Sequence, residues 1–215
     1  MKKLTLALVA SALSIGATSA HINTGFYLGG AVGYGATTGR ATVTNVTGVN
    51  AHGDTAANIG IHGGYGWVQN CTYFGAEVAY TFENTKITNS LFGTAGASQT
   101  LKRDGYFGVA LRAGYLFTPA TMAYIRLGGN WGKWKLNDNN FAFAGTTSAG
   151  SKNRLSFAPG FGLETAVHKN VYLRGEYTYE FGPTVSAKAG NNPATALTFG
   201  RVRSQSAKVG LSYKF

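Results

Sequence analysis

The sequence predicts an all-β fold, an eight-stranded antiparallel transmembrane β-barrel with up-and-down topology. Eight segments alternate apolar residues with small or polar ones, which is the two-residue period of a β-strand. The connections between these segments are alternately long and short. After residue 20, no apolar run reaches the roughly 20 residues that a transmembrane helix needs. If the chain enters a membrane, it therefore does so as a closed barrel.

The first 20 residues have the pattern of a cleaved signal peptide. Lys2 and Lys3 form a basic start, residues 4–15 are a short apolar segment, and residues 16–20 are mostly small. We expect export, a mature N-terminus at His21, and a barrel domain over residues 21–215. The alternative is an uncleaved anchor, although the apolar segment is too short to span a membrane as a helix.

The first four strands are expected at residues 26–34, 57–68, 73–83 and 106–117. Phe26 and Tyr27 place an aromatic ring on each face of the first strand, so its two faces are not sharply separated. The second and fourth strands carry glycine and other small residues opposite their apolar faces. The third strand gives the clearest alternation, with one face formed by Phe74, Ala76, Val78, Tyr80 and Phe82.

The last four strands are expected at residues 122–135, 154–167, 171–181 and 201–215. The alternation is lost over residues 132–135, where we expect the fifth strand to leave the membrane. Pro159 has no amide hydrogen and predicts a bulge or kink in the sixth strand. The closing strand has no later segment to cover its apolar face, which favours contact with lipid. That face consists of Ala207, Val209, Leu211, Tyr213 and Phe215.

The loop lengths support a membrane barrel. The connections at residues 35–56, 84–103, 136–153 and 182–200 are long, whereas those at 69–72, 118–121 and 168–170 are short. Barrels of outer membranes show this asymmetry, with long loops outside and short turns in the periplasm. Aromatic residues also gather toward both ends of the apolar faces, as Phe74 and Phe82 do, which predicts an aromatic girdle at each interface.

Residues 21–215 as a whole resemble the small eight-stranded outer-membrane barrels of Gram-negative bacteria, of the opacity-protein type and the 25-to-31-kDa surface-antigen type. The segments that carry the resemblance are Gly25–Gly30, Leu111–Tyr115, Gly162–Glu164, Val171–Tyr179 and Val209–Phe215. The resemblance implies a location in the cell outer membrane. It also implies insertion by periplasmic chaperones and the barrel-assembly machinery, which would read Tyr213 and Phe215 as the assembly signal. It does not imply one function, because members anchor, adhere, or bind host factors or haem.

Six charged residues on expected inward faces lie three to six residues from the short turns. Three carboxylates and three guanidiniums make this layer neutral, so we expect an interior ion-pair plug, with Glu77 beside Arg112 and Arg126 beside Glu164. An eight-stranded barrel is just wide enough for its side chains to fill. A gated ion path is the alternative. The predicted lumen charge layer is Glu77, Arg112, Arg126, Glu164, Arg174 and Glu176.

A second set of charges lies near the expected outer ends of four strands. Only Asp104 and Asp138 oppose these cations locally. They are expected either to form a solvated rim or to bind the phosphates of lipopolysaccharide through charge-assisted contacts. The predicted basic rim is Lys102, Arg103, Lys133, Lys135, Lys152, Arg154, Arg201 and Arg203.

No pattern in the sequence favours catalysis, a metal or a cofactor. Cys71 is the single cysteine and has no metal-binding motif around it, and the four histidines are scattered. His52 or His62 could hold haem only as a single ligand. The formal charge of +11 invites a nucleic-acid partner, but the export signal and the absence of basic runs argue against one.

The sequence therefore predicts a surface-exposed structural or interaction protein of the outer membrane. Envelope integrity, adhesion and contact with a host factor are the roles that fit this class, and outer-membrane lipid and lipopolysaccharide are the expected surroundings. A small channel or porin-like pore is the first alternative. A barrel enzyme or a haem-binding surface protein is the second.

Overall fold

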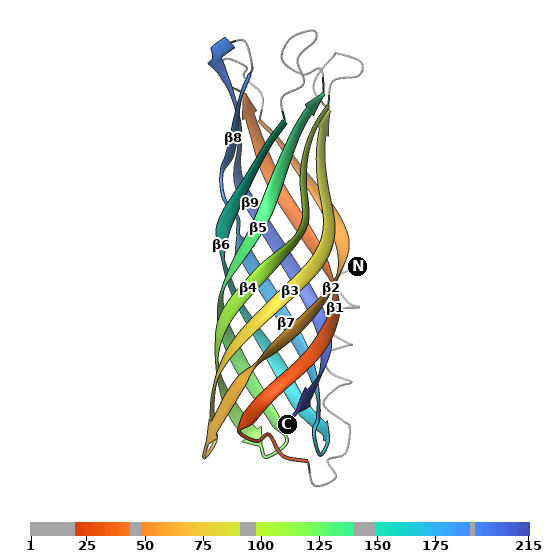
Figure 1. The fold of residues 1–215 in the computed structure, drawn as a ribbon, viewed down its shortest axis with the longest axis vertical. Helices are drawn as coiled ribbons and strands as arrows, with labels where there is room; N and C mark the ends of the chain where they lie inside the picture. Colours follow the sequence, from red (N-terminus) through yellow and green to blue (C-terminus); the bar gives the residue numbers. More distant parts are fainter. Residues whose placement is uncertain (1–19, 44–48, 91–97, 140–148, 190–191) are drawn as a thin grey trace.

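The computed structural model describes residues 20–43, 49–90, 98–139, 149–189 and 192–215 (Figure 1). The predicted signal peptide, apart from Ala20, lies outside these residues. Among the described residues, no helix is long and apolar enough to span a membrane. The strands are β1 (Gly25–Val43), β2 (Val49–Gln69), β3 (Thr72–Ser90), β4 (Ser98–Thr118), β5 (Thr121–Asn139), β6 (Ala149–His168), β7 (Val171–Phe181), β8 (Val185–Ala189) and β9 (Asn192–Lys214).

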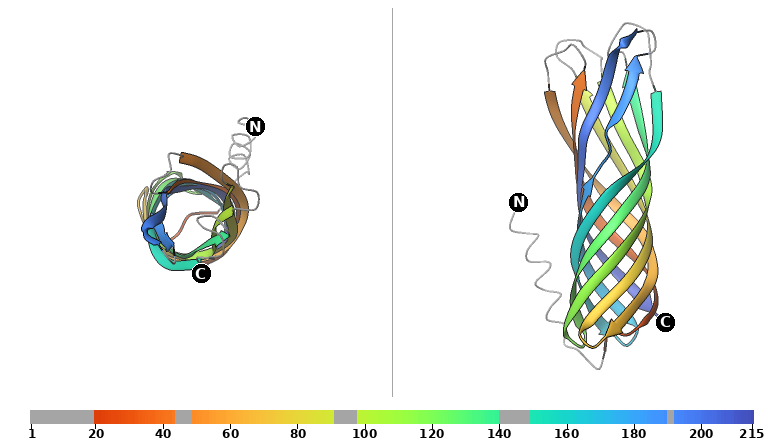
Figure 2. Two further views of the ribbon diagram at one scale, coloured as in Figure 1. Left: turned by 90° about the horizontal axis from the view of Figure 1, so that it is seen from above. Right: turned by 90° about the vertical axis from the view of Figure 1, so that its left-hand side faces the viewer.

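The strands form one closed barrel, seen along its axis in Figure 2. Consecutive strands pair antiparallel, and β1 closes the ring by pairing with β9. β7 and β8 act as one barrel strand, because the register that pairs Phe181 with Arg203 continues in the pairing of Val185 with Phe199. Residues 182–184, which include Pro183, interrupt this strand. The predicted eight-stranded antiparallel barrel is confirmed.

Most strands are much longer than the alternation of the sequence predicts. The first long connection was expected at residues 35–56, but β1 and β2 continue their ladder through this stretch as far as the pair Thr42 and Val49. β3 and β4 likewise pair up to Ser90 and Ser98. A transmembrane β-strand needs only about 9–11 residues. Beyond the bilayer the outer face becomes polar, so the apolar alternation that marks a strand ends although its hydrogen bonding continues.

The two faces of the wall are inverted relative to a water-soluble domain. Large apolar side chains such as Leu111 and Trp131 are exposed on the outside, whereas arginines and glutamates are buried inside. Aromatic rings stand toward both ends of this outer apolar band, with Phe26 and Trp67 toward one edge and Tyr34 toward the other. The band is the lipid-facing surface that the sequence predicts.

The two ends of the barrel differ. The end that carries the turns at residues 70–71, 119–120 and 169–170 is called the turn end below, and the opposite end the distal end. Asn70 has a φ of 55°, a left-handed conformation that asparagine tolerates better than most residues. The C-terminus lies at the turn end (Figure 1).

Inward-facing tyrosines lie over inward-facing glycines. The rings of Tyr73 and Tyr124 lie against Gly66 and Gly162, where an added Cβ atom would approach ring atoms to 2.6 Å and 2.5 Å. Tyr27 covers Gly64 in the same way, at 2.7 Å. These glycines are required because a side chain would occupy the volume that the ring fills.

We expect Gly162→Ala to lower the stability of the refolded barrel by about 1 to 3 kcal/mol, because it overpacks the contact with Tyr124. The matched control is Gly175→Ala on the adjacent strand, since a Cβ atom there meets nothing within 4 Å. Unfolding temperatures, followed by heat-modifiable gel mobility, measure both. Equal unfolding temperatures for the two variants would contradict the role given to the ring contact.

Candidate functional site: the barrel lumen

Arg112 is the centre of a buried charge layer in the turn-end half of the lumen. Only 2% of Arg112 is exposed. Its guanidinium donates to Glu164 at 2.6 Å and lies 3.7 Å from a carboxylate oxygen of Glu77. It also donates to the hydroxyl of Tyr27 at 3.4 Å and stacks over the ring of Tyr124 at 3.9 Å. Strands β1, β3, β5 and β6 therefore all supply groups that hold this one side chain.

The other members of the predicted layer also face the lumen, but they pair differently from the sequence-based expectation. Arg174 donates to Glu77 at 2.6 Å, across the lumen rather than to a neighbouring strand. Arg126 does not pair with Glu164; its nearest carboxylate is that of Glu176, at 3.7 Å. The register explains the difference, because Arg126 lies opposite Gly160, four residues from Glu164. The expected pair of Glu77 with Arg112 is present only as the longer 3.7 Å contact.

His62 and Ser212 meet across β1. The Nε2 atom of His62 lies 2.8 Å from the hydroxyl of Ser212, although their strands, β2 and β9, are separated by β1. Gly29 lies between them, and a Cβ atom there would come within 2.6 Å of His62 and 2.7 Å of Ser212. Both side chains are buried on the inner face of the barrel, so this pair is an internal packing contact rather than a site open to lipid.

A second charged cluster, nearer the distal end, contains a residue that was predicted for the outer rim. Arg103 was expected in a rim that is solvated or binds lipopolysaccharide, but it is buried and pairs with Glu83 and Glu180. The reason is a β-bulge: the register of β4 shifts between Arg103 and Tyr106, which reverses which residues face inward. Trp134 lies under the guanidinium, with its ring centroid 4.6 Å away. Residues 132–135, where the sequence alternation is lost, therefore still alternate between the outside and the lumen.

The turn end is closed by an apolar cluster that includes residues before β1. Ile22 is buried there, and its amide donates to Pro119 O at 2.8 Å. Tyr172 donates to the carbonyl of His21 at 2.9 Å. Met122 at the centre is completely buried. The closing cluster consists of Ala20, Ile22, Tyr73, Leu116, Ala120, Met122, Tyr124, Ala166 and Tyr172.

Of the remaining rim cations, five lie on the outer surface, and two have side chains that the structure does not describe. Lys133, Arg154 and Arg203 are exposed, and Lys102 and Lys135 both bind Asp104, at 2.8 Å and 2.7 Å. The side chains of Lys152 and Arg201 are not among those that the structure describes.

Tyr213 and Phe215 are exposed on the lipid-facing side, with ring centroids 5.3 Å apart. Their role as an assembly signal stays a prediction.

Sequence reasoning missed several lumen residues. Glu83 and Glu180 were not assigned to the layer, although Glu180 has the same inward parity as Arg174 and Glu176. The predicted strand over residues 171–181 already contains Glu180, but the layer was limited to positions three to six residues from the short turns. No signal in the sequence reveals the bulge that brings Arg103 inside.

This chain matches a known protein family and is similar to solved structures of outer-membrane proteins. The family model described as an outer membrane protein beta-barrel domain matches residues 5–215. The outer membrane protein OprG from Pseudomonas aeruginosa is similar in structure, with a TM-score of 0.61 and 14% identity, over 91% of this chain and 98% of that one. Neisserial surface protein A (NspA) has a TM-score of 0.45 and 17% identity, over 88% and 97%. Ail, the attachment invasion locus protein of Yersinia pestis, has a TM-score of 0.42 and 15% identity, over 90% and 100%. No curated protein sequence matches this chain.

Arg112→Ala is expected to destabilise the refolded barrel by about 3 to 5 kcal/mol, because it leaves a buried carboxylate without its cation. Adding Glu164→Ala should recover more stability than adding Glu77→Ala, since Glu77 keeps Arg174 at 2.6 Å. Unfolding temperatures of the single and double variants test this, and ion leakage through the refolded barrel should rise in Arg112→Ala.

The matched control is Lys133→Ala, which removes an exposed cation from the outer face. A smaller recovery of stability with Glu164→Ala than with Glu77→Ala would show that the 2.6 Å pair of Arg112 with Glu164 is not the dominant contact of Arg112.

Proposed function

Because this chain belongs to the family of outer membrane protein β-barrel domains, we propose that it serves as a surface-exposed structural and interaction protein of the outer membrane. Its distal end then carries the long connections outward, and its turn end faces the periplasm. Envelope integrity, adhesion and contact with a host factor are the roles that such a barrel can fill.

One observation carries this proposal: the wall continues well beyond the apolar band at the distal end. Tyr34 is at the edge of that band, yet β1 runs on to Val43. Nine further residues correspond to roughly 20 Å of height for a tilted strand. The exposed positions of this extension are mainly polar, as at Thr38, Thr55, Lys86, Asp104, Lys133, Asn153 and Gln205.

The side chains inside the barrel favour this role over an open pore. Within the described residues, the lumen is crossed by the layer around Arg112 and by the cluster around Arg103, and it is closed at the turn end by the apolar cluster. A small channel remains the second candidate, because the lumen is polar. Planar-bilayer recordings separate the two, since a steady open-pore current from the unmodified protein would favour the channel.

We do not propose catalysis. The closest approach to a nucleophile with a base is the pair of Ser212 and His62, and both are buried inside the wall, where a lipid or surface substrate has no access. Hydrolysis of lipid esters by the purified barrel, lost in Ser212→Ala, would be evidence against this view.

The proposed orientation can be tested with the single cysteine of the chain. Cys71 is exposed in a turn at the turn end. A maleimide attached to a polymer too large for the outer membrane should leave Cys71 unlabelled on intact cells. It should label Cys71 after the outer membrane is disrupted, because the turn end then becomes accessible.

The complementary variant moves the thiol to the other end. Cys71→Ser combined with Ser151→Cys places it at an exposed distal position of β6 and should be labelled on intact cells. Labelling of Cys71 from outside, without labelling at position 151, would mean that the orientation is inverted.

We further propose that the exposed rim cations bind lipopolysaccharide phosphate. Replacing Lys102, Lys133, Arg154 and Arg203 with Gln should lower lipopolysaccharide retention at least about tenfold at low salt, because cations near an anionic surface contribute about 1 kcal/mol each. The difference should shrink at high salt as the charges are screened. Co-purified lipopolysaccharide is the measurement.

Lys169→Gln is the control for the rim, because Lys169 is exposed at the opposite end of the barrel. Unchanged retention in the fourfold variant at low salt would leave the rim as a merely solvated surface.

A further inference from the structure

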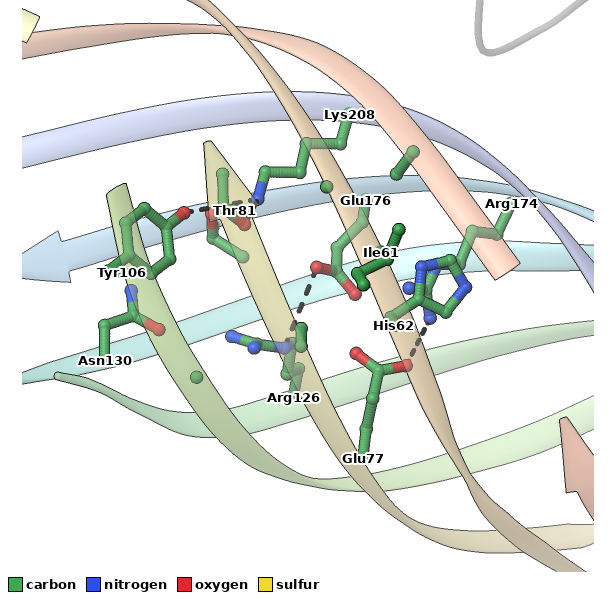
Figure 3. Close-up of a pocket in the computed structure, with 15 residues that line it drawn as sticks. Ile61, His62, Glu77, Thr81, Tyr106, Arg126, Asn130, Arg174, Glu176 and Lys208 are labelled. Atoms are coloured by element: carbon green, nitrogen blue, oxygen red, sulfur yellow. Dashed lines mark hydrogen bonds and ion pairs between the residues drawn. The ribbon is translucent and has the colours of Figure 1, made fainter. Parts of the chain in front are cut away.

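A small polar chamber lies in the lumen between the layer around Arg112 and the cluster around Arg103. Figure 3 shows the residues that line it. It has a volume of about 30 Å³. Gly60 and Gly108 leave parts of its wall without side chains, and Thr81, Tyr106, Arg126 and Lys208 supply polar groups. The chamber is large enough for one or two water-sized species.

Lys208 brings a positive charge into this chamber without a bound carboxylate. Its ammonium donates to the hydroxyls of Thr81 at 3.0 Å and Tyr106 at 3.2 Å. None of the ion pairs formed by the described residues includes Lys208. Glu176 is its neighbour across the ladder, but the carboxylate of Glu176 accepts from Tyr124 at 2.9 Å and lies toward Arg126.

The hydroxyl groups beside Lys208 still have protons to donate. Each hydroxyl accepts from the ammonium, so the O–H bonds of Thr81 and Tyr106 are free to point into the chamber. The ammonium and the two O–H groups therefore offer donors to a species placed between them, while Asn130 Oδ1, which also borders the chamber, is an acceptor without a partner among the described residues. An acceptor that carries negative charge satisfies such a set best.

Arg126 is the second cation of the chamber and is incompletely bonded. Its side chain is more than nine-tenths buried, yet its Nε atom makes no hydrogen bond among the described residues and lies 3.7 Å from Oε1 of Glu176. Its one hydrogen bond there is a long one, from Nη1 to the carbonyl of Ala158 at 3.3 Å. A buried guanidinium with an orphaned donor is costly, and a nearby acceptor relieves that cost.

The charges that border the chamber sum to a positive value. Lys208, Arg126 and Arg174 face two carboxylates, those of Glu77 and Glu176. We propose that the chamber is a binding site for a single halide-sized inorganic anion, held between the ammonium of Lys208 and the guanidinium of Arg126. The anion would supply the missing negative charge and accept from the free hydroxyls.

Bromide is the probe for this site. The refolded barrel is kept at constant ionic strength while sodium gluconate is replaced by sodium bromide, because gluconate is too large for the chamber. The unfolding temperature of the unmodified protein should rise and saturate with bromide, since a ligand of the folded state stabilises it by mass action. Crystals grown in bromide should show an anomalous peak between Lys208 and Arg126.

Two variants and one control make the test specific. Lys208→Met removes the ammonium, and Gly108→Ala fills the chamber without changing any charge, since its Cβ atom would lie 3.0 Å from Oδ1 of Asn130 and 3.8 Å from Nη2 of Arg126. Each should raise the apparent bromide dissociation constant about tenfold or more. Lys169→Met removes an exposed cation at the turn end and should leave the bromide response unchanged.

The absence of a saturable bromide response in the unmodified protein would overturn the proposal. So would a response of the same size in both Lys208→Met and Gly108→Ala, because bromide would then act elsewhere on the barrel. If Lys208→Met fails to fold, Gly108→Ala decides the question alone, since it retains the ammonium and every carboxylate of the lumen.

Discussion

The need to satisfy every backbone polar group in lipid is the constraint on which this structure depends. No water is present in the bilayer core to bond a free strand edge, so the sheet must close on itself. The pairing of β1 with β9 meets this requirement from the pair Tyr27 and Lys214 to the pair Val43 and Leu197. Once the sheet is closed, the two-residue period of each strand divides its residues between lipid and a narrow interior.

That interior is too narrow for charges to remain hydrated as they are in bulk water. Arginines and glutamates must therefore find each other. Arg112 does so with carboxylates from β3 and β6 and an aromatic face from β5, although its Nε atom has no hydrogen-bond partner among the described residues. Lys208 forms none of the ion pairs of the described residues, and the carboxylate nearest to Arg126 lies 3.7 Å away. The layer around Arg112 and the cluster around Arg103 fill the lumen, and the chamber lies between them.

The sequence was sufficient to predict the fold and the members of the lumen layer, but not their partners. Alternation fixes which side of the wall a residue faces, so Glu77 and Arg174 could both be assigned to the interior. Their 2.6 Å contact crosses the lumen, however, and depends on the tilt and stagger of strands that the sequence does not reveal. Arg103 was assigned wrongly because a single bulge reverses the alternation. The long distal ladders were missed because, outside the bilayer, a strand no longer needs an apolar outer face.

The layer around Arg112 also bears on the order in which the barrel assembles. Its contacts join residues that are far apart in the chain: Arg112 and Glu164 are 52 positions apart, and Glu77 and Arg174 are 97 apart. Such contacts form only when strands from both halves of the chain surround the same lumen, so they belong to the last steps of folding. Interactions that are absent from the transition state slow unfolding rather than speed folding. We therefore expect the layer to slow the unfolding of the closed barrel more than it speeds folding.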